Sequence, residues 1–392
     1  MDALTTPSNW QKVRLGDIGK PCMCKRVMKH QTTRYGEIPF YKIGTFGNTA
    51  DAFISKKLFL EYKTKYSFPK KGDILISASG TIGRAVIYDG KPAYFQDSNI
   101  VWIDNDETLV KNDFLFYAYS HVKWNTEHTT ILRLYNDNFR NTLIPLPPLN
   151  EQIAIANILS DVDRYLYSLD ALILKKESVK KALSFELLSQ RKRLKGFNQA
   201  WQRVRLGDIC EFGNGGAYET LIVENGDFKL ISLNSIDIDG NLKNTMKRVN
   251  FYDNSLKQDD IVMVLSDVAH GDFLGLCAVI PSNDYVLNQR MGRLRKRNDC
   301  INILFLRLYI NANQKYFKMQ GQGSSQLNLS KKAIEDFEIL LPPLNEQIAI
   351  ANVLSALDNE IISLKNKKRQ FDNIKKALNH DLMSAKIRVL KK

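Results

Sequence analysis

An internal repeat is the feature that most limits how this chain folds, because two copies of one sequence predict two copies of one structure. A head motif occurs at Trp10–Ile18 as WQKVRLGDI and at Trp201–Ile209 as WQRVRLGDI. A longer motif occurs at Leu146–Asp163 as LPPLNEQIAIANILSDVD and at Leu341–Asp358 as LPPLNEQIAIANVLSALD. Each copy therefore has a head motif, a body, an LPPLNEQ motif and a long tail.

The bodies between these motifs have diverged strongly. Apolar runs of strand length occur at 73–78 and 260–265, and shorter runs at 85–88 and 278–280 follow glycine-containing turns. We therefore expect mixed α/β bodies in which a rigid sheet carries loops with the recognition residues. One framework with two different contents is typical of two readers of different signals.

The tails have the apolar spacing of a coiled coil. Apolar residues recur every three or four positions, at Ile155, Leu159, Val162, Leu166, Leu169 and Ile173 in the first copy and at Ile350, Leu354, Leu357, Ile361 and Leu364 in the second. Prolines precede each tail, and Asn150 or Asn345 is expected to cap the helix. The first helix, running to about Leu188, is about 60 Å long. Because a lone helix of this length leaves its apolar stripe in water, we expect the two helices to pack on each other.

The composition favours a polyanionic partner. The chain has 56 Lys and Arg against 42 Asp and Glu, a formal net charge of +14. Nucleic acid, an anionic membrane surface and a ribosomal contact all suit such a charge. The five cysteines are expected to be free thiols, because Cys22 and Cys24 lack the second ligand pair of a zinc site. With no signal peptide and no run of about 20 apolar residues, the expected location is the cytoplasm.

The duplicated motifs and their long helices resemble the specificity subunit of type I restriction-modification systems over nearly the whole chain. The predicted fold class is α/β (α+β), with two tandem mixed α/β target-recognition domains separated by a long antiparallel two-helix coiled coil of pseudo-two-fold symmetry. The expected boundaries are residues 1–146 for the first recognition domain, 147–196 for the central helix, 197–341 for the second recognition domain and 342–392 for the C-terminal helix.

The resemblance also implies partners and cofactors. Each recognition domain is expected to read one half of a bipartite asymmetric site on double-stranded DNA. Methyltransferase (modification) subunits would carry S-adenosylmethionine, and motor-nuclease (restriction) subunits would use ATP and Mg. This chain itself is expected to bind no cofactor, no metal and no membrane.

Motifs for catalysis are missing from the sequence. It lacks the nucleotide-binding G-x(4)-G-K-(S/T) loop, the (N/D)-P-P-(Y/F) tetrapeptide of adenine methyltransferases and a carboxylate and lysine cluster of nuclease type. The glycine-rich segment 212–216 is interpreted as a turn. Segment 79–84 is either a loop that brings Arg84 to a DNA phosphate or a structural turn. We therefore expect a non-catalytic recognition subunit; the alternative is a structural coiled-coil adaptor with non-specific DNA contact.

Polar residues on predicted loops are the candidate DNA contacts. Asn and Gln can pair with adenine and Arg with guanine, whereas Lys and Ser suit phosphate. The candidates in the first body are Ser79, Thr81, Arg84, Gln96, Asp97, Ser98, Asn99, Arg133, Tyr135, Asn136, Asn138 and Arg140. Those in the second are Asn288, Gln289, Arg290, Arg293, Gln320, Gln322, Ser324, Ser325, Gln326 and Asn328. Any one of them can equally be a solvated loop residue, so the prediction applies to the clusters.

Overall fold

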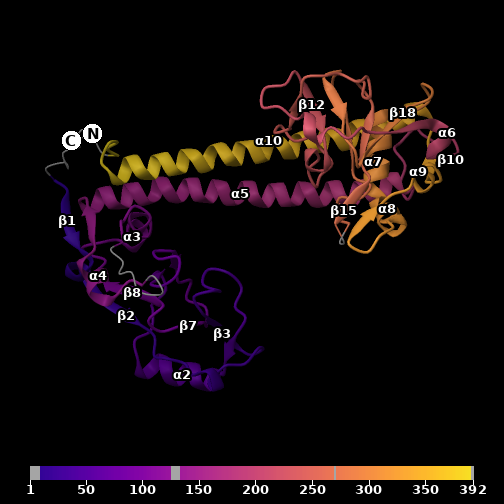
Figure 1. Cartoon of the computed structure of the whole chain (residues 1–392). Coiled ribbons are helices and arrows are strands. Elements are labelled where there is room, and N and C mark those ends of the chain that lie inside the picture. Colours follow the sequence, from indigo (N-terminus) through magenta and orange to yellow (C-terminus); the bar gives the residue numbers. More distant parts are fainter. Residues whose placement is uncertain (1–8, 125–132, 269–270, 390–392) are drawn as a thin grey trace. The chain divides into compact units, whose positions relative to one another are not determined.

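The computed structural model describes residues 9–124, 133–268 and 271–389. The chain forms two compact units, residues 1–170 with 366–392 and residues 171–365. Each unit contains one α/β body together with part of each of the two long helices (Figure 1). The repeat in the sequence is therefore a repeat in the structure.

The first body is built on a four-stranded sheet of order β2-β8-β5-β6 and a three-stranded sheet of order β4-β3-β7. Strands β1 and β9 close the body as an antiparallel pair in which Val13 lies opposite Ile144. The bounds are β1 Gln11–Arg14, β2 Gly19–Met23, β3 Ile38–Tyr41, β4 Phe53–Ile54, β5 Ile74–Ser77, β6 Ala85–Ile87, β7 Tyr94–Phe95, β8 Ile100–Asn105 and β9 Leu143–Leu146.

The second body repeats this topology strand for strand. Its sheets have the orders β11-β18-β14-β16 and β13-β12-β17, and β10 pairs with β20 so that Val204 lies opposite Ile339. An additional pair, β15-β19, has no counterpart among the named strands of the first body. The bounds are β10 Gln202–Arg205, β11 Cys210–Asn214, β12 Phe228–Ile231, β13 Arg248–Val249, β14 Ile261–Val264, β15 Ser266–Val268, β16 Cys277–Val279, β17 Tyr285–Leu287, β18 Met291–Lys296, β19 Gln326–Asn328 and β20 Glu338–Leu341.

Short helices complete the two bodies. They are α1 Leu15–Ile18, α2 Lys56–Lys65, α3 Asn112–Tyr119 and α4 Asn136–Asn141 in the first, and α6 Leu206–Ile209, α7 Ile303–Ala312, α8 Gln314–Gln320 and α9 Lys331–Glu335 in the second. Single 3-10 turns lie at Lys29–Gln31, Glu219–Leu221 and Leu233–Ser235. The predicted mixed α/β bodies are confirmed, and β5 and β14 lie in the apolar runs at 73–78 and 260–265.

The two long helices are α5, Leu149–Leu188, and α10, Leu344–Met383. Although the Oδ1 atoms of Asn150 and Asn345 accept the N–H groups of Glu151 and Glu346 at 2.9 Å, neither asparagine is the predicted N-cap, because each lies inside the first turn of its helix. The carbonyl oxygen of Pro148 also accepts the N–H groups of Glu151 at 2.9 Å and Gln152 at 3.0 Å. Proline suits this position because its fixed φ favours the start of a helix.

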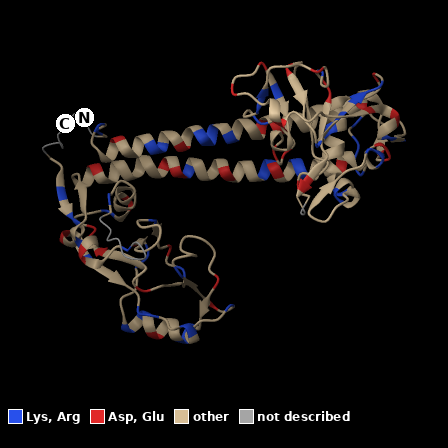
Figure 2. Ribbon diagram, viewed as in Figure 1, with Lys and Arg blue, Asp and Glu red and all other residues tan. Residues whose placement is uncertain are grey.

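Ion pairs between the helices establish that α5 and α10 run antiparallel within each unit. In the first unit, Asp170 pairs with Lys368 at 2.7 Å, and Asp163 pairs with Lys375 further along both helices. In the second unit, Glu177 pairs with Lys365 at 2.7 Å, and Lys180 pairs with Asp358. Both helices carry Lys and Arg as well as Asp and Glu along their length (Figure 2).

The apolar seam is largely buried, with Leu166, Leu169 and Ile361 at most 7% exposed. Its first residues have a second role. Ile155 and Leu159 pack in the core of the first body with Leu382 and Met383 from the end of α10. In the same way, Ile350, Ala351 and Leu354 join the core of the second body with Leu187 and Leu188 from the end of α5. Each body is therefore attached to the start of one helix and the end of the other.

The repeated motifs form a buried clamp in the first unit. The carboxylate of Glu151, 2% exposed, accepts a hydrogen bond from Trp10 Nε1 at 3.1 Å. It also accepts two hydrogen bonds from the Arg388 guanidinium, at 2.7 and 2.9 Å. Next to it, Gln152 Oε1 accepts the N–H of Lys111 at 2.9 Å. Glu151 and Gln152 of LPPLNEQ thus join the head motif, the body and the segment that follows α10.

The second unit contains the same clamp. Glu346 accepts hydrogen bonds from Trp201 Nε1 at 3.0 Å and from Arg193 at 3.0 and 2.5 Å, and these bonds raise the pKa of Arg193. Gln347 accepts the N–H of Asn302 at 2.8 Å. The motifs are therefore explained by their structural role, which composition and spacing did not predict.

Candidate nucleic-acid interface

The candidate residues of the first body come from three separated segments that meet at the end of β5. The N–H of Ala78 donates to the carbonyl oxygen of Asn99 at 2.8 Å, and the N–H of Leu134 donates to the carbonyl oxygen of Ala78 at 2.9 Å. The hydroxyl of Ser79, 5% exposed, donates to Asn99 Oδ1 at 2.8 Å. This joint brings the clusters at 79–84, 96–99 and 133–140 together.

The second body has the same joint at the end of β14. The N–H of Leu265 donates to the carbonyl oxygen of Arg290 at 3.0 Å, and the N–H of Leu329 donates to that of Leu265 at 2.8 Å. Ser266 Oγ donates to Asn328 Oδ1. The predicted clusters at 288–293 and 320–328 therefore converge, in the place equivalent to that of the first body.

Several candidates in the first body hold the joint with their side chains. Gln96 Oε1 accepts the N–H of Ile43 at 2.9 Å, and Asp97 forms an ion pair with Arg26 at 2.8 Å. The Thr142 hydroxyl donates to the backbone carbonyl oxygen of Asn138 at 2.7 Å. The more exposed candidates are Thr81, Arg84, Ser98, Arg133, Tyr135, Asn136 and Arg140. Arg26, whose side chain is 66% exposed, belongs to this surface but was not predicted.

The candidates in the second body divide in the same way. Asn288 is 4% exposed; it accepts the N–H of Tyr218 at 3.0 Å and donates to Glu219 at 2.9 Å. Hydrogen bonds from Gln289 and Asn288 hold the pKa of Glu219 below its usual value. Arg293 pairs with Glu211 at 2.5 Å. The exposed candidates are Arg290, Gln320, Gln322, Ser324, Ser325 and Asn328, and Gln326 is half-buried.

A hollow of about 460 Å³ lies among the candidates of the second body, beside β15 and β19. Arg290, Ser325 and Gln326 line it, together with residues that were not predicted, including Asn234, Lys243 and Val268. Val268 was missed although it follows Ser266 by two positions, as the predicted Thr81 follows Ser79. This equal spacing in the two copies was the sequence signal that could have identified Val268.

Of the two glycine-rich segments, 79–84 forms a tight turn and 212–216 continues strand β11. Gly80 and Gly83 have φ of +67° and +84°, and strand β6 rather than a helix follows them. The Arg84 guanidinium lies 3.4 Å from Asn48 Oδ1. A Cβ added to Gly215 would lie 2.1 Å from the Asn288 carbonyl oxygen, so this segment is packed against the joint. The interpretation of segment 212–216 as a turn is wrong, because residues 212–214 belong to strand β11 and Gly216 forms a bridge with Asn288.

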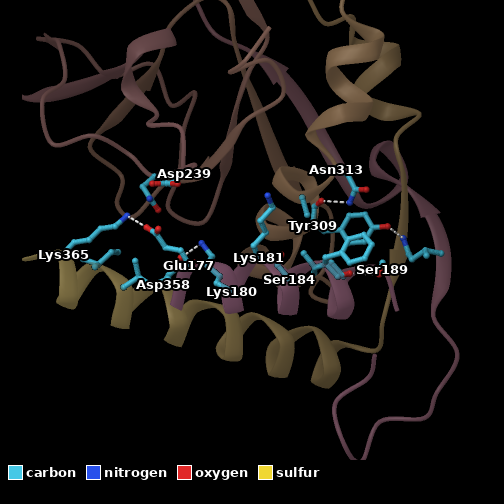
Figure 3. Close-up of a pocket in the computed structure, with 17 residues that line it drawn as sticks. Glu177, Lys180, Lys181, Ser184, Ser189, Asp239, Tyr309, Asn313, Asp358 and Lys365 are labelled. Carbon is cyan, nitrogen blue, oxygen red and sulfur yellow. Dashed lines mark hydrogen bonds and ion pairs between the residues drawn. The ribbon is translucent and has the colours of Figure 1, made fainter. Parts of the chain in front are cut away.

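A further hollow, of about 900 Å³, lies within the second unit between the long helices and the body (Figure 3). Tyr309 and Asn313 from the body face Ser184 and Ser189 of the α5 end. Its acidic residues are largely neutralised, since Glu177 pairs with Lys365 and Asp358 with Lys180. None of the predicted DNA contacts lines this hollow.

The described residues contain no group of three or more His, Cys, Asp or Glu that could hold a metal ion. All five cysteines are free, as predicted, and burial raises the pKa of Cys24 to about 12. Among the helices of the described segments, none is long and apolar enough to cross a membrane.

Comparison with protein families decides the identity of the repeat. The type I restriction modification DNA specificity domain, Methylase_S, matches residues 7–176 and 198–371. The chain belongs to this family. Each match contains one body and the beginning of the following helix, so the tandem recognition domains are confirmed.

Relatives and solved structures agree with this membership. The specificity subunit of the type I restriction enzyme MjaVIII from Methanocaldococcus jannaschii is 29% identical over 420 residues, covering 99% of this chain and 95% of that protein. A Haemophilus influenzae protein named as specificity subunit S.HindORF215P is 64% identical over 148 residues, which span 38% of this chain and 38% of that relative. The S subunit of a type I system from M. genitalium has a similar fold, with a TM-score of 0.65, 18% identity and coverage of 97% and 98%. Membership in the specificity family assigns this chain to DNA sequence recognition in type I restriction-modification.

Proposed function

We propose that each of the two bodies reads one half of a bipartite asymmetric DNA site. The observation that supports this is the duplicated joint, which presents different side chains from the same place in each unit. Arg133 of the first body takes the position that Asn328 takes in the second, opposite Ser79 and Ser266. Arginine and asparagine prefer different base edges, so one framework suits two half-sites.

The chain acts in the cytoplasm without catalysing a reaction itself. Methyltransferase subunits carrying S-adenosylmethionine modify the site, and motor-nuclease subunits using ATP and Mg restrict DNA that lacks the modification. The excess of positive charge supports binding to phosphates around the site. The bases read by the exposed side chains of the joint direct where these partners act.

Methylation provides the first test. The purified chain added to its cognate methyltransferase should produce methylation at one bipartite sequence, and the chain alone should produce none. Binding to that site should weaken steeply with salt but remain stronger than binding to a scrambled duplex. Equal binding to both duplexes would support the adaptor alternative and contradict this proposal.

The helix pair should set the gap between the half-sites. Four residues advance a helix by about 6 Å, or nearly two base pairs of DNA. An insertion at Ser178 of α5 alone falls beside Glu177 and Lys180, both of which pair with α10, and displaces Arg193 from its clamp.

Paired insertions avoid this damage. Four residues placed after Asp170 in α5 and four after Lys365 in α10 fall at the boundaries of the compact units and leave the contacts inside each unit intact. We expect the gap to lengthen by about one or two base pairs, with both half-sites unchanged in methylome sequencing. The single insertion serves as the control and should reduce methylation. A fully active paired variant with the original gap would contradict the role of the helices.

A further inference from the structure

An exposed apolar side chain lies among the polar candidates of the second body. Val268, at the end of β15, is 66% exposed and lines the 460 Å³ hollow with Arg290, Ser325 and Gln326. Single exposed apolar residues are common on protein surfaces. The position of Val268 at the joint, between side chains suited to base edges, gives this one a specific meaning.

The backbone at Val268 is held in place. Both carboxylate oxygens of Asp267 accept backbone N–H groups, from Val268 at 2.8 Å and from Phe273 at 2.7 Å. The main chain of Val268 also pairs with Gln326 in the β15-β19 ladder. Val268 therefore lies in a strand whose backbone is fixed by hydrogen bonds. Both carboxylate oxygens of Asp267 already accept hydrogen bonds from the protein.

The chemistry left available in the hollow suits the major groove of DNA. In the described part of the chain, the side chains of Arg290, Lys243 and Gln326 form no ion pair or hydrogen bond with other residues. The available groups are thus two cations, a carboxamide and the methyl groups of Val268. Arginine pairs with guanine and glutamine with adenine, while an apolar side chain contacts the methyl group that only thymine carries there.

The first body has a β-branched residue at the corresponding position in the sequence. Ser79 and Ser266 each bridge to the third segment of the joint, at Arg133 and Asn328. Two residues further on lie Thr81 and Val268, both exposed. Thr81 lies in a turn after Gly80, whose φ is +67°, whereas Val268 lies in strand β15, and Thr81 carries a hydroxyl that Val268 lacks.

We propose that Val268 contacts the C5-methyl group of a thymine and makes one T·A pair a fixed position of the half-site read by the second body. This inference rests on the proposed DNA-reading function. It predicts that recognition at this pair depends on the methyl group and not on hydrogen bonds alone. Arg290 and Gln326 read neighbouring pairs.

Uracil substitution tests the contact, because uracil is thymine without the methyl group. The half-sites are first determined from the methylome. The full chain, in complex with its methyltransferase, is then titrated with duplexes in which each thymine of the second half-site is replaced singly by uracil. We expect one replacement to weaken binding roughly three- to five-fold, as for the loss of one buried methyl group.

Val268→Ala should bind the thymine duplex more weakly by a similar factor and should no longer distinguish thymine from uracil at that pair. Thr81→Ala is the matched control, and it should leave recognition of the second half-site unchanged. If the unsubstituted protein tolerates every uracil, or if Val268→Ala keeps the full discrimination, the contact is wrong although DNA reading stands. If the unsubstituted complex binds no defined site, the proposed function fails, and the inference fails with it.

Discussion

Replacing Arg388 with alanine should destabilise the first unit by about 3–5 kcal/mol, the usual effect of removing one partner from a buried ion pair. The Glu151 carboxylate is 2% exposed and would retain Trp10 as its hydrogen-bonding side chain. Its charge would then lie in the protein interior without a compensating cation. The segment that follows α10 would also lose its ion pair with the start of α5.

Lys42→Ala provides the matched control in the same unit. Lys42 pairs with Asp51 at 2.8 Å, but the two side chains are 41% and 59% exposed. Such surface pairs contribute about 0–1 kcal/mol. Hydrogen exchange read by mass spectrometry measures the opening free energy of each unit separately. We expect Arg388→Ala to increase exchange in the first unit, and an effect no larger than that of Lys42→Ala would contradict the clamp.

Much of the fold could be predicted because the repeat and the heptad spacing are local properties of the sequence. The seam from Leu159 to Leu169 and the strand at 260–265 follow from periodicity alone. The helix begins earlier than predicted. Asparagine is a common helix cap, which favoured Asn150, but the carbonyl oxygen of Pro148 accepts the first N–H groups of the helix. The clamp was missed because Glu151 and Arg388 are far apart in sequence, although Arg193 and Arg388 follow their LPPLNEQ motifs at equal spacing.

The candidate site could be predicted only as clusters. Sequence polarity does not distinguish Asn288, which holds the joint from a buried position, from Arg290, which is exposed two residues later. That division depends on partners such as Tyr218 and Glu219 from another segment. Val268 was not predicted because the candidates were chosen for their ability to form hydrogen bonds, which excludes apolar side chains. The methyl group of thymine is contacted by apolar side chains.

Exchanging one body for a copy of the other should convert the asymmetric site into a symmetric one. In this variant, residues 19–141 are replaced by residues 210–336 of the same chain. The junctions are equivalent, because the N–H of Leu15 donates to the Thr142 carbonyl oxygen as that of Leu206 donates to Phe337, at 2.9 and 2.8 Å.

The transplanted body should pack against nearly identical buried residues of the two long helices. The buried helix residues that pack against a body are three from the start of one helix and two from the end of the other, Ile155, Ala156, Leu159, Leu382 and Met383 in the first unit and Ile350, Ala351, Leu354, Leu187 and Leu188 in the second. They differ only in Met383 against Leu188. Gln152 can bind the N–H of Asn302 as Gln347 does. The copied body should therefore fold in its new place.

Methylome sequencing should show an interrupted inverted repeat of the half-site read by the second body, because the helices that carry the two bodies run antiparallel. Modification of the original site should fall on the order of 1,000-fold or more, since each mismatched pair costs about 1–3 kcal/mol. The reciprocal variant, with residues 19–141 in place of 210–336, should give the inverted repeat of the other half-site. If either variant folds and still modifies the original asymmetric sequence, the bodies do not determine the half-sites. Reading must then reside in the framework that both units share.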